Sequence, residues 1–264
     1  MNLKYLLGAL IAFPLLPILR YQGNKLKKTV PILPEATGTR GSCKVKNSSK
    51  NPLKLITLGE STIAGVGVKT HEEGFTGMLA KQLSELNEQT VHWKVYARSG
   101  YTASRITEEI VTEISDAEAD LIVIGIGGND AFTLNTPTQW RADVKKLIDT
   151  LRTKFPEVAI VFCNMPAIKE FPVFPTLIKF TLGNLVEILG EELSVTIKNY
   201  SGVYYHSEVI TLRKWMHKVP FKTQKSDFFS DGMHPSKLTY QVWATEVAKT
   251  IVSDLGPSLS KTKN

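Results

Sequence analysis

The chain has 264 residues, of which 42% are apolar and 22% are charged, a composition typical of a globular protein and not of a disordered one. Its net charge of +7 is concentrated in residues 1–54, which hold ten Lys or Arg residues but only one acidic residue, Glu35. Of the 32 basic and 25 acidic residues in the whole chain, 22 and 24 lie beyond this segment, so no nucleic-acid partner is expected. A basic cluster beside an apolar segment instead suits anionic lipid head groups.

The N-terminal segment is apolar enough to meet a membrane. Residues 5–19 carry no charge and as a helix span about 22 Å, against about 30 Å for a hydrocarbon core. Counted from Met1, with Lys4 extending to the interface, the helix reaches about 28 Å. No small-residue cleavage site follows it, so an uncleaved anchor is favoured over a signal peptide. An in-plane or re-entrant segment is a third interpretation, because Pro14 and Pro17 kink a helix.

The predicted organisation has four parts. They are a membrane anchor or signal-anchor with a basic flank at 1–28, a linker at 29–51, a globular domain at 52–256 and a polar tail at 257–264. Membrane association is expected, in one of two orientations. Positive-inside bias would keep the globular domain in the cytoplasm, whereas a signal-anchor role would place it on the periplasmic or extracellular side.

Beyond the linker, apolar strands alternate with helices. The predicted strands are residues 53–58, 91–97, 121–126, 158–163 and 203–206. The predicted helices are residues 70–86, a segment with apolar residues at helical spacing between 106 and 114, the helix beginning at 137, and residues 176–199 and 235–254. Because most strands are apolar on both faces, the pattern predicts an α/β fold with a parallel five-stranded sheet covered by helices on each side.

Two helix starts carry sequence signals. Thr70 and Glu73 have the spacing of a capping box. Thr136 directly before Pro137 suits an N-cap followed by proline at the first helical position.

In a parallel sheet the functional site lies beyond the carboxyl ends of the strands, and a serine occupies such a place here. Gly59, Glu60 and Ser61 directly follow the first strand, where a tight turn could present the serine hydroxyl to a cleft. This is not the G-x-S-x-G elbow, because position 63 is Ile. The alternative is a serine that only caps the next helix.

Two further strand ends offer hydrogen-bond donors. Gly100, after the second strand, can present its backbone N–H to an anionic oxygen, although an ordinary turn glycine is the alternative. Asn129, in the GGND block after the third strand, can donate its side-chain amide to a developing oxyanion. Its neighbour Asp130 is expected to cap the following turn.

Asp231 and His234 lie just before the last predicted helix. A spacing of three lets the carboxylate accept a hydrogen bond from Nδ1 of the ring, which leaves Nε2 to deprotonate a serine. The alternative is a loop aspartate that caps the helix beside a surface histidine. The remaining histidines fit a catalytic base less well: His71, His92, His206 and His217. No cluster of His, Cys and acidic residues has convincing metal-ligand spacing, so neither a metal nor a cofactor is expected.

In order and spacing, residues 53–254 resemble the SGNH hydrolase superfamily, the GDSL-like lipases and esterases. The motifs that carry the resemblance are GEST with Ser61, RSG with Gly100, GGND with Asn129, and DGMH with Asp231 and His234.

This resemblance implies a flavodoxin-like, three-layer α/β/α sandwich and a Ser-His-Asp mechanism. Ser61, His234 and Asp231 would form the triad. The Ser61 N–H, the Gly100 N–H and the Asn129 side chain would form the oxyanion hole. One departure is that Glu60 stands where the family has Asp; if that acid only braces the turn, little changes.

Two long connections beside the expected site are aromatic. Residues 165–182 carry Phe171, Phe174 and Phe180, and residues 212–229 carry Trp215, Phe221, Phe228 and Phe229. They suggest an acyl-chain pocket or a membrane-facing rim, with ordinary packing on the sheet as the alternative. Together with the anchor, they favour an acyl ester, a lysophospholipid or a thioester as substrate. A carbohydrate O-deacetylase using the same triad and a non-catalytic binding protein remain as alternatives, and no oligomeric state is assigned.

Overall fold

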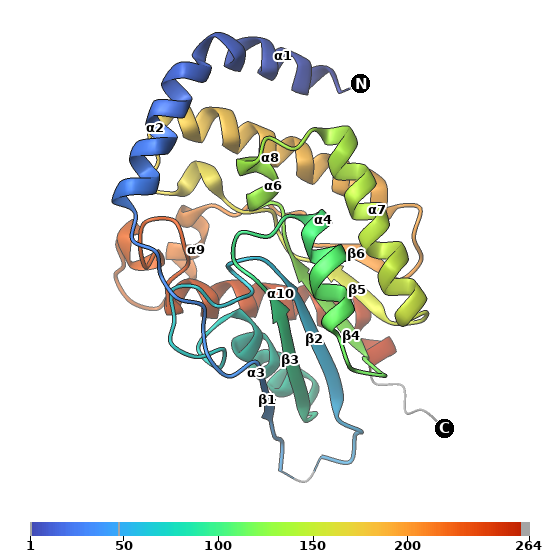
Figure 1. The fold of residues 1–264 in the computed structure, drawn as a ribbon. Helices are drawn as coiled ribbons and strands as arrows, with labels where there is room; N and C mark the ends of the chain where they lie inside the picture. Colours follow the sequence, from blue (N-terminus) through green and yellow to red (C-terminus); the bar gives the residue numbers. More distant parts are fainter. Residues whose placement is uncertain (1, 47, 260–264) are drawn as a thin grey trace.

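The computed structural model describes residues 2–46 and 48–259, with a six-stranded sheet at its centre (Figure 1). In chain order the strands are β1 (Arg40–Cys43), β2 (Leu53–Gly59), β3 (Val91–Ala97), β4 (Leu121–Gly125), β5 (Ala159–Phe162) and β6 (Val203–Tyr205). Their order in the sheet is β1-β3-β2-β4-β5-β6. Only β1 is antiparallel, pairing with β3 at one edge. The predicted α/β class and the five parallel strands are confirmed, and β1 is an addition.

The segment predicted to be a linker is attached to the domain over much of its length. Arg40–Cys43 pairs with β3 along its whole length. Gly41 lies against Trp93 so closely that a Cβ would be 2.3 Å from the indole Cζ2 atom. Before this strand, the N–H of Ala36 donates to the carbonyl of Ala64 at 2.9 Å. The strand is too short and too exposed to produce an alternating apolar pattern, which is why the sequence did not predict it.

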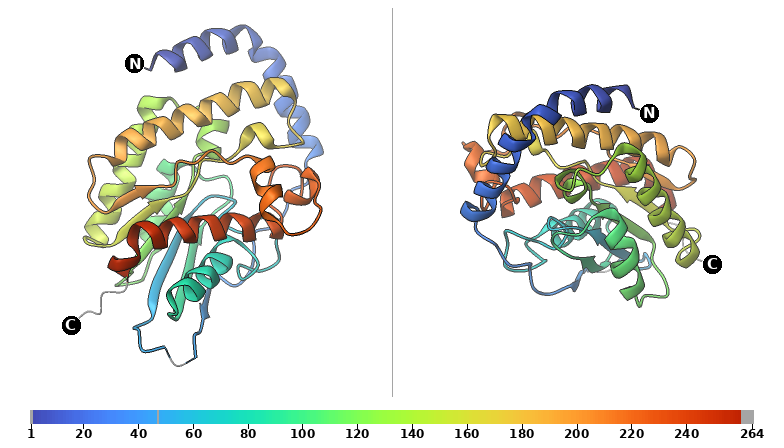
Figure 2. Two further views of the ribbon diagram at one scale, coloured as in Figure 1. Left: turned by 180° about the vertical axis from the view of Figure 1, so that it is seen from behind. Right: turned by 45° about the horizontal axis from the view of Figure 1, so that its top comes forward.

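Helices cover both faces of the sheet (Figure 2). One face holds α3 (Phe75–Asn87), α9 (Leu212–Lys218) and α10 (Lys237–Leu259). The other holds α4 (Ala103–Arg105), α5 (Val111–Glu113), α6 (Gly128–Phe132), α7 (Pro137–Lys154) and α8 (Thr176–Ile197). Strand β4 shows why both faces are covered. Leu121 and Val123 pack into the core under α3 and α10, and Ile122 and Ile124 pack into the core under α7 and α8. A strand that is apolar on both faces is buried between two helical layers.

One of the two predicted helix starts is confirmed. The Thr136 side chain accepts a hydrogen bond from the N–H three residues later, and α7 begins directly after it. The capping box predicted at Thr70 is wrong, because α3 begins only at Phe75 and has no side-chain cap. Instead, the Glu73 carboxylate pairs with Lys237 of α10 at 2.8 Å.

The helical segment predicted between 106 and 114 is confirmed. It runs from Ala103 to Glu113 and contains a π-helical stretch at Ile106–Ile110 between α4 and α5. Helix α10 extends to Leu259, so the first residues of the predicted polar tail are helical. Residues 260–264 of that tail lie outside the described residues.

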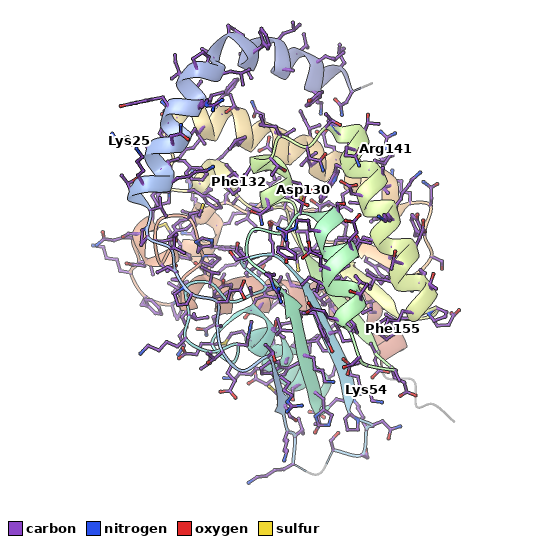
Figure 3. All side chains as sticks on the ribbon, in the orientation of Figure 1. Lys25, Lys54, Asp130, Phe132, Arg141 and Phe155 are labelled. Atoms are coloured by element: carbon purple, nitrogen blue, oxygen red, sulfur yellow. The ribbon has the colours of Figure 1, made fainter. Side chains whose placement is uncertain are left out.

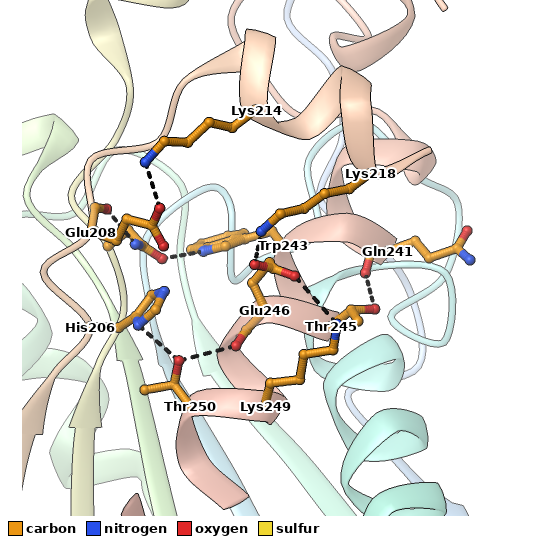
Figure 4. Close-up of polar contacts among 11 residues, drawn as sticks. His206, Glu208, Lys214, Lys218, Gln241, Trp243, Thr245, Glu246, Lys249 and Thr250 are labelled. Carbon is orange, nitrogen blue, oxygen red and sulfur yellow. Dashed lines mark hydrogen bonds and ion pairs between the residues drawn. The ribbon is translucent and has the colours of Figure 1, made fainter. Parts of the chain in front are cut away.

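The connection that follows β6 is held to α10 by polar contacts (Figure 4). The Lys218 side chain forms an ion pair with Glu246, and Thr250 Oγ1 lies 3.1 Å from His206 Nδ1. These contacts give His206 a role in the fold.

The N-terminal segment is helical and bent. It consists of α1 (Leu3–Ala12), a 3₁₀ turn (Phe13–Leu15) that contains Pro14, and α2 (Leu16–Thr29). Helix α1 runs alongside α8, and α2 turns away from it (Figures 1 and 2). The stretch Leu3–Thr29 contains an 18-residue window with a mean hydropathy of 1.6, which by length and composition is enough to cross a membrane.

Candidate active site

Ser61 lies in the turn that directly follows β2. The N–H of Ile63 donates to the Glu60 carbonyl at 2.9 Å, so the chain turns sharply at the serine. A Cβ on Gly59 would lie 2.3 Å from the carbonyl oxygen of Gly125 in the neighbouring strand. Only glycine therefore fits at this strand end. Ser61, two residues later, is half-buried.

The residue before the serine, Glu60, is buried and links two parts of the site. Its carboxyl oxygens accept hydrogen bonds from the N–H groups of Gly128 and Asn129 at 2.7 and 2.8 Å. Burial raises the pKa of Glu60 to about 8, while the two hydrogen bonds act in the opposite direction. Glu60 thus braces the serine turn against the asparagine block, across neighbouring strand ends.

The Asn129 side chain is held at the same end of the sheet. Its Nδ2 atom donates to the Tyr101 carbonyl at 3.1 Å. A carboxamide nitrogen has two N–H groups, and the Asn129 side chain also acts on the Glu60 carboxyl, whose pKa it lowers.

The sequence predicted that Asp130 caps the turn that follows it, but its carboxylate reaches a different segment. Its carboxylate accepts from the Ala103 N–H at 3.1 Å and from Asn135 Nδ2 at 3.1 Å, so it caps the start of α4. Burial raises the pKa of Asp130 to about 6. Asp130 and Phe132 lie at the end of the sheet opposite Lys54 (Figure 3).

Gly100 adopts a left-handed backbone conformation, with φ +83°. A Cβ there would meet no heavy atom within 4 Å, so the backbone angle and not crowding requires glycine. The adjacent N–H, that of Ser99, donates to Glu35 Oε1 at 2.6 Å. Glu35 belongs to the segment predicted to be a linker, and this segment therefore helps to hold the loop that carries Gly100.

Asp231 and His234 form a close pair. His234 Nδ1 lies 2.7 Å from Asp231 Oδ2, and Asp231 Oδ1 accepts from the N–H groups of Met233 and His234 at 2.9 and 2.7 Å. Burial acts to raise the pKa of Asp231, but the hydrogen bonds from the ring and the two amides outweigh it and lower the pKa below its usual value. The carboxylate is therefore ionised at neutral pH and orients the ring through Nδ1.

The serine turn and the histidine loop touch, although they lie far apart in the sequence. The Tyr240 hydroxyl of α10 donates to the Val66 carbonyl at 2.7 Å. A Cβ on Gly67 would lie 2.3 Å from the Pro235 carbonyl oxygen. Close backbone packing thus sets the position of one loop against the other.

A groove of about 1350 Å³ joins the predicted site residues. Ser61, Gly100, Asn129 and His234 all border it, and Asp231 lies behind the histidine with a side chain that solvent does not reach. Much of the remaining lining is apolar and comes from α8, the end of α6, α1 and α2. Four of the five residues predicted for the site thus border one groove, and the fifth, Asp231, contacts His234.

The two aromatic connections differ in what they do. Phe174 and Phe180 border the groove, Phe180 with 48% of its surface exposed. Trp215 and Phe228, from the second connection, are buried in the core under α10. For these two the packing alternative holds. The groove takes its aromatic lining from the first connection, from Phe132 and from Tyr5 and Phe13 of the N-terminal segment.

Three residues that position the site were not predicted: Glu35, Tyr101 and Tyr240. Their hydrogen bonds join residues 64, 28 and 174 positions apart, and such contacts leave no local pattern. Glu35 alone carries a sequence signal, as the single acidic residue in a basic segment.

The other histidines are away from the groove lining. His71 is buried, and burial lowers its pKa to about 4. Within residues 2–46 and 48–259, no group of three or more His, Cys, Asp or Glu side chains is placed to hold a metal ion.

The chain is a three-layer α/β/α sandwich whose candidate site residues follow the carboxyl ends of parallel strands, as in many α/β/α enzymes. A sequence profile of the GDSL-like lipase/acylhydrolase family matches residues 57–242, and the chain belongs to this family. It is accordingly an esterase-type hydrolase. No curated protein sequence matches the chain.

Solved structures share the fold at low sequence identity. A family 3 carbohydrate esterase from Clostridium thermocellum is 17% identical, with a TM-score of 0.56 over 80% of this chain and 100% of that one. A lipase/acylhydrolase from Enterococcus faecalis is 18% identical, with a TM-score of 0.54 over 76% and 96%. An extracellular lipase from Streptomyces rimosus is 13% identical, with a TM-score of 0.52 over 75% and 99%.

Proposed function

We propose that this protein cleaves carboxylic esters of long acyl chains, with Ser61 as nucleophile, His234 as general base and Asp231 as the residue that orients the ring. The observation that carries the proposal is the 2.7 Å contact between His234 Nδ1 and Asp231 Oδ2, beside a groove that Ser61 also borders. With Nδ1 engaged, Nε2 is the ring atom that accepts the serine proton.

The reaction has two halves. Ser61 Oγ attacks the ester carbonyl carbon while its proton passes to His234 Nε2, and a tetrahedral intermediate forms. The imidazolium then protonates the leaving alcohol, which departs and leaves an acyl-enzyme. Water, deprotonated by the same ring, attacks the acyl-enzyme, and the carboxylic acid leaves as the proton returns to Ser61.

Three donors stabilise the negative oxygen of each intermediate: the Ser61 N–H, the Gly100 N–H and the Asn129 side chain. The Asn129 bond to the Tyr101 carbonyl supports this role, because it holds the amide in place before charge develops. A donor that is already oriented costs no reorganisation during the reaction.

The groove lining favours an acyl chain over a sugar. Phe132, Phe174, Ile178 and Leu185 border it together with the apolar side chains of α1 and α2. Burial of apolar surface contributes about 0.8 kcal/mol for each methylene, so a long chain gains much more than an acetyl group. Acyl esters, lysophospholipids and thioesters all present such a chain.

Carbohydrate O-deacetylation by the same triad is the alternative that the similarity to the Clostridium thermocellum esterase suggests. It requires an open polar groove, and the apolar lining argues against it. A non-catalytic binding role is disfavoured, because each position of the serine mechanism is filled.

The test is labelling by a fluorophosphonate probe and hydrolysis of p-nitrophenyl butyrate. Ser61→Ala should abolish labelling and lower kcat at least about 10³-fold, with an unchanged melting temperature. Ser99→Ala is the matched control, because Ser99 also borders the groove and should keep both signals. Retained hydrolysis or labelling in Ser61→Ala would exclude this mechanism.

We also propose that residues 1–28 attach the hydrolase domain to a membrane. The apolar stretch Leu3–Thr29 and the basic residues of α2 support this. The protein should sediment with membranes and resist extraction by alkaline carbonate. Release by carbonate would exclude an apolar anchor.

A further inference from the structure

One wall of the groove comes from outside the family domain. Helices α1 and α2 precede residue 57, where the match to the family begins, yet they supply a large share of the groove lining. Their contribution includes Tyr5, Gly8, Ala9, Ala12, Leu16, Leu19 and Leu26. The facing wall is α8 with the residues before it, including Phe174, Ile178, Leu182, Leu185 and Ile188.

Helix α1 lies against α8, with Tyr5 packed on the core, but open space remains beside two glycines of the N-terminal helices. A Cβ built on Gly8 would meet no heavy atom within 4 Å, and the same holds for Gly23 of α2. Both glycines border the groove. Where two helices pack directly, such small residues normally bring the backbones into contact; here they widen an open volume that is continuous with Ser61 and His234.

Polar contacts hold the amino end of α1 on α8. Lys4 Nζ lies 2.5 Å from Glu191 Oε1, and Asn2 Nδ2 donates to Glu192 Oε1 at 3.2 Å. Glu192 is also bound by Arg141 of α7, with Nε at 3.0 Å from Oε2. The helix is thus attached at one end, while its middle borders the groove.

The two sides of α1 face different surroundings. The side that borders the groove carries three small residues, Gly8, Ala9 and Ala12, together with Lys4, Tyr5 and Ile11. The large side chains of Leu3, Leu7 and Leu10 lie outside its lining and are 68%, 54% and 72% exposed. Leucines exposed in a row along one helix suit a lipid environment, and the small residues leave room for a ligand on the other side.

We infer that α1 and α2 form one wall of the acyl-chain site, so that the membrane-attaching segment itself determines which acyl chain lengths the enzyme accepts. This inference rests on the proposed esterase function. The occupant is the long acyl chain of an ester whose carbonyl lies at Ser61, because the groove is apolar and continuous with the predicted catalytic residues. Its volume of about 1350 Å³ exceeds the roughly 300–1,000 Å³ of a typical small-molecule pocket.

The experiment compares acyl chain lengths in the full-length protein. We would measure kcat/KM for p-nitrophenyl butyrate and p-nitrophenyl palmitate in detergent mixed micelles. Gly8→Leu and Ala12→Phe fill the groove side of α1, and Leu10→Phe adds bulk at a position outside the lining. Leucine is a stronger helix former than glycine, so Gly8→Leu keeps α1 folded.

Both groove-side variants should lower the palmitate-to-butyrate ratio of kcat/KM by about 10-fold or more, with butyrate hydrolysis retained, because a filled groove excludes the long chain. Leu10→Phe should leave the ratio within about 2-fold of the unmodified protein. An unchanged ratio in Gly8→Leu and Ala12→Phe, or an equal fall in Leu10→Phe, would overturn the inference.

Ser61→Ala separates the two possible failures. If that variant still hydrolyses butyrate, the proposed function fails. If it is inactive but the groove-side variants keep the palmitate-to-butyrate ratio, only the role of α1 as a wall fails.

Discussion

The side of the groove that holds the predicted catalytic residues and the wall formed by α1 and α2 are built in opposite ways. On the catalytic side, buried carboxyl groups hold the backbone in place: Glu60 accepts two amide hydrogen bonds, and Asp231 accepts hydrogen bonds from two amides and from the His234 ring. On the N-terminal side, no residue of α1 or α2 is buried. That wall depends on the contacts at Asn2 and Lys4 and on partly buried apolar residues.

This difference corresponds to two physical requirements. Stabilising a transition state requires donors and a base that are already in place. Admitting a long, flexible chain requires a wall whose displacement costs little free energy, and segments with few buried contacts open most readily. The predictions below test whether the two sides differ as this comparison requires.

The largest effect is expected from Asp231→Asn on the rigid side. Without the carboxylate the ring adopts the wrong tautomer, and kcat for p-nitrophenyl butyrate should fall about 10⁴-fold. Asp254→Asn, an exposed aspartate on α10, is the control and should be unaffected. A loss below about 10-fold in Asp231→Asn would mean that His234 does not depend on this partner.

A smaller loss is expected from Asn129→Ala. Removing one oxyanion donor should lower kcat by about 10²- to 10³-fold with little change in KM. Asn184→Ala is the matched control, because Asn184 borders the same groove from α8. The kcat of this variant should stay near that of the unmodified enzyme. Equal losses in both variants would show that the groove lining, and not oxyanion stabilisation, is responsible.

A pH effect on stability is expected from Glu60. Its pKa rises from 4.5 to about 8 in the folded protein, so the folded state holds this proton more tightly than the unfolded one. The stabilisation from that proton is complete below about pH 4.5 and is lost as the pH rises through about 8. The melting temperature should therefore fall over this range, and the fall should be shallower in Glu60→Gln.

Glu72→Gln, an exposed glutamate of the same domain, controls for the loss of a charge. If the melting temperatures of Glu60→Gln and of the unmodified protein change in parallel with pH, the buried carboxyl is not the source of the fall in melting temperature.

The smallest effect is expected from Lys4→Gln. The Lys4–Glu191 pair is exposed, at 67% and 52% of the two side chains, and such pairs contribute about 0–1 kcal/mol. The melting temperature of the domain should change by less than about 4 °C in scanning fluorimetry. A larger drop would show that the N-terminal wall is as firmly held as the catalytic one, and the comparison would fail.

The features predictable from the sequence are those with a local pattern. Strand β4 was predictable because five successive buried residues leave an uninterrupted apolar run. The gathering of Ser61, Gly100 and Asn129 was predictable because each follows a strand of one parallel sheet.

The remaining features arise from contacts between distant segments. The Glu60 brace spans 68 positions, and the sequence shows only that an acid stands there. Strand β1 has half-exposed residues and takes its order from pairing with β3. The position of α1 beside α8 follows from Asn2 and Lys4 meeting acids about 190 positions away, which no periodicity reveals.

The attachment of Ala36 to Ala64 has a geometric consequence for how the enzyme could work at a surface. Because Glu35 is bound to the Ser99 loop, only residues 30–34 connect α2 to the domain. This connecting segment spans about 17 Å when fully extended. If α2 lies in a bilayer, a connection this short keeps Ser61, the proposed nucleophile, close to the lipid head groups. The reach of the hydrolase is then confined to molecules at that same surface.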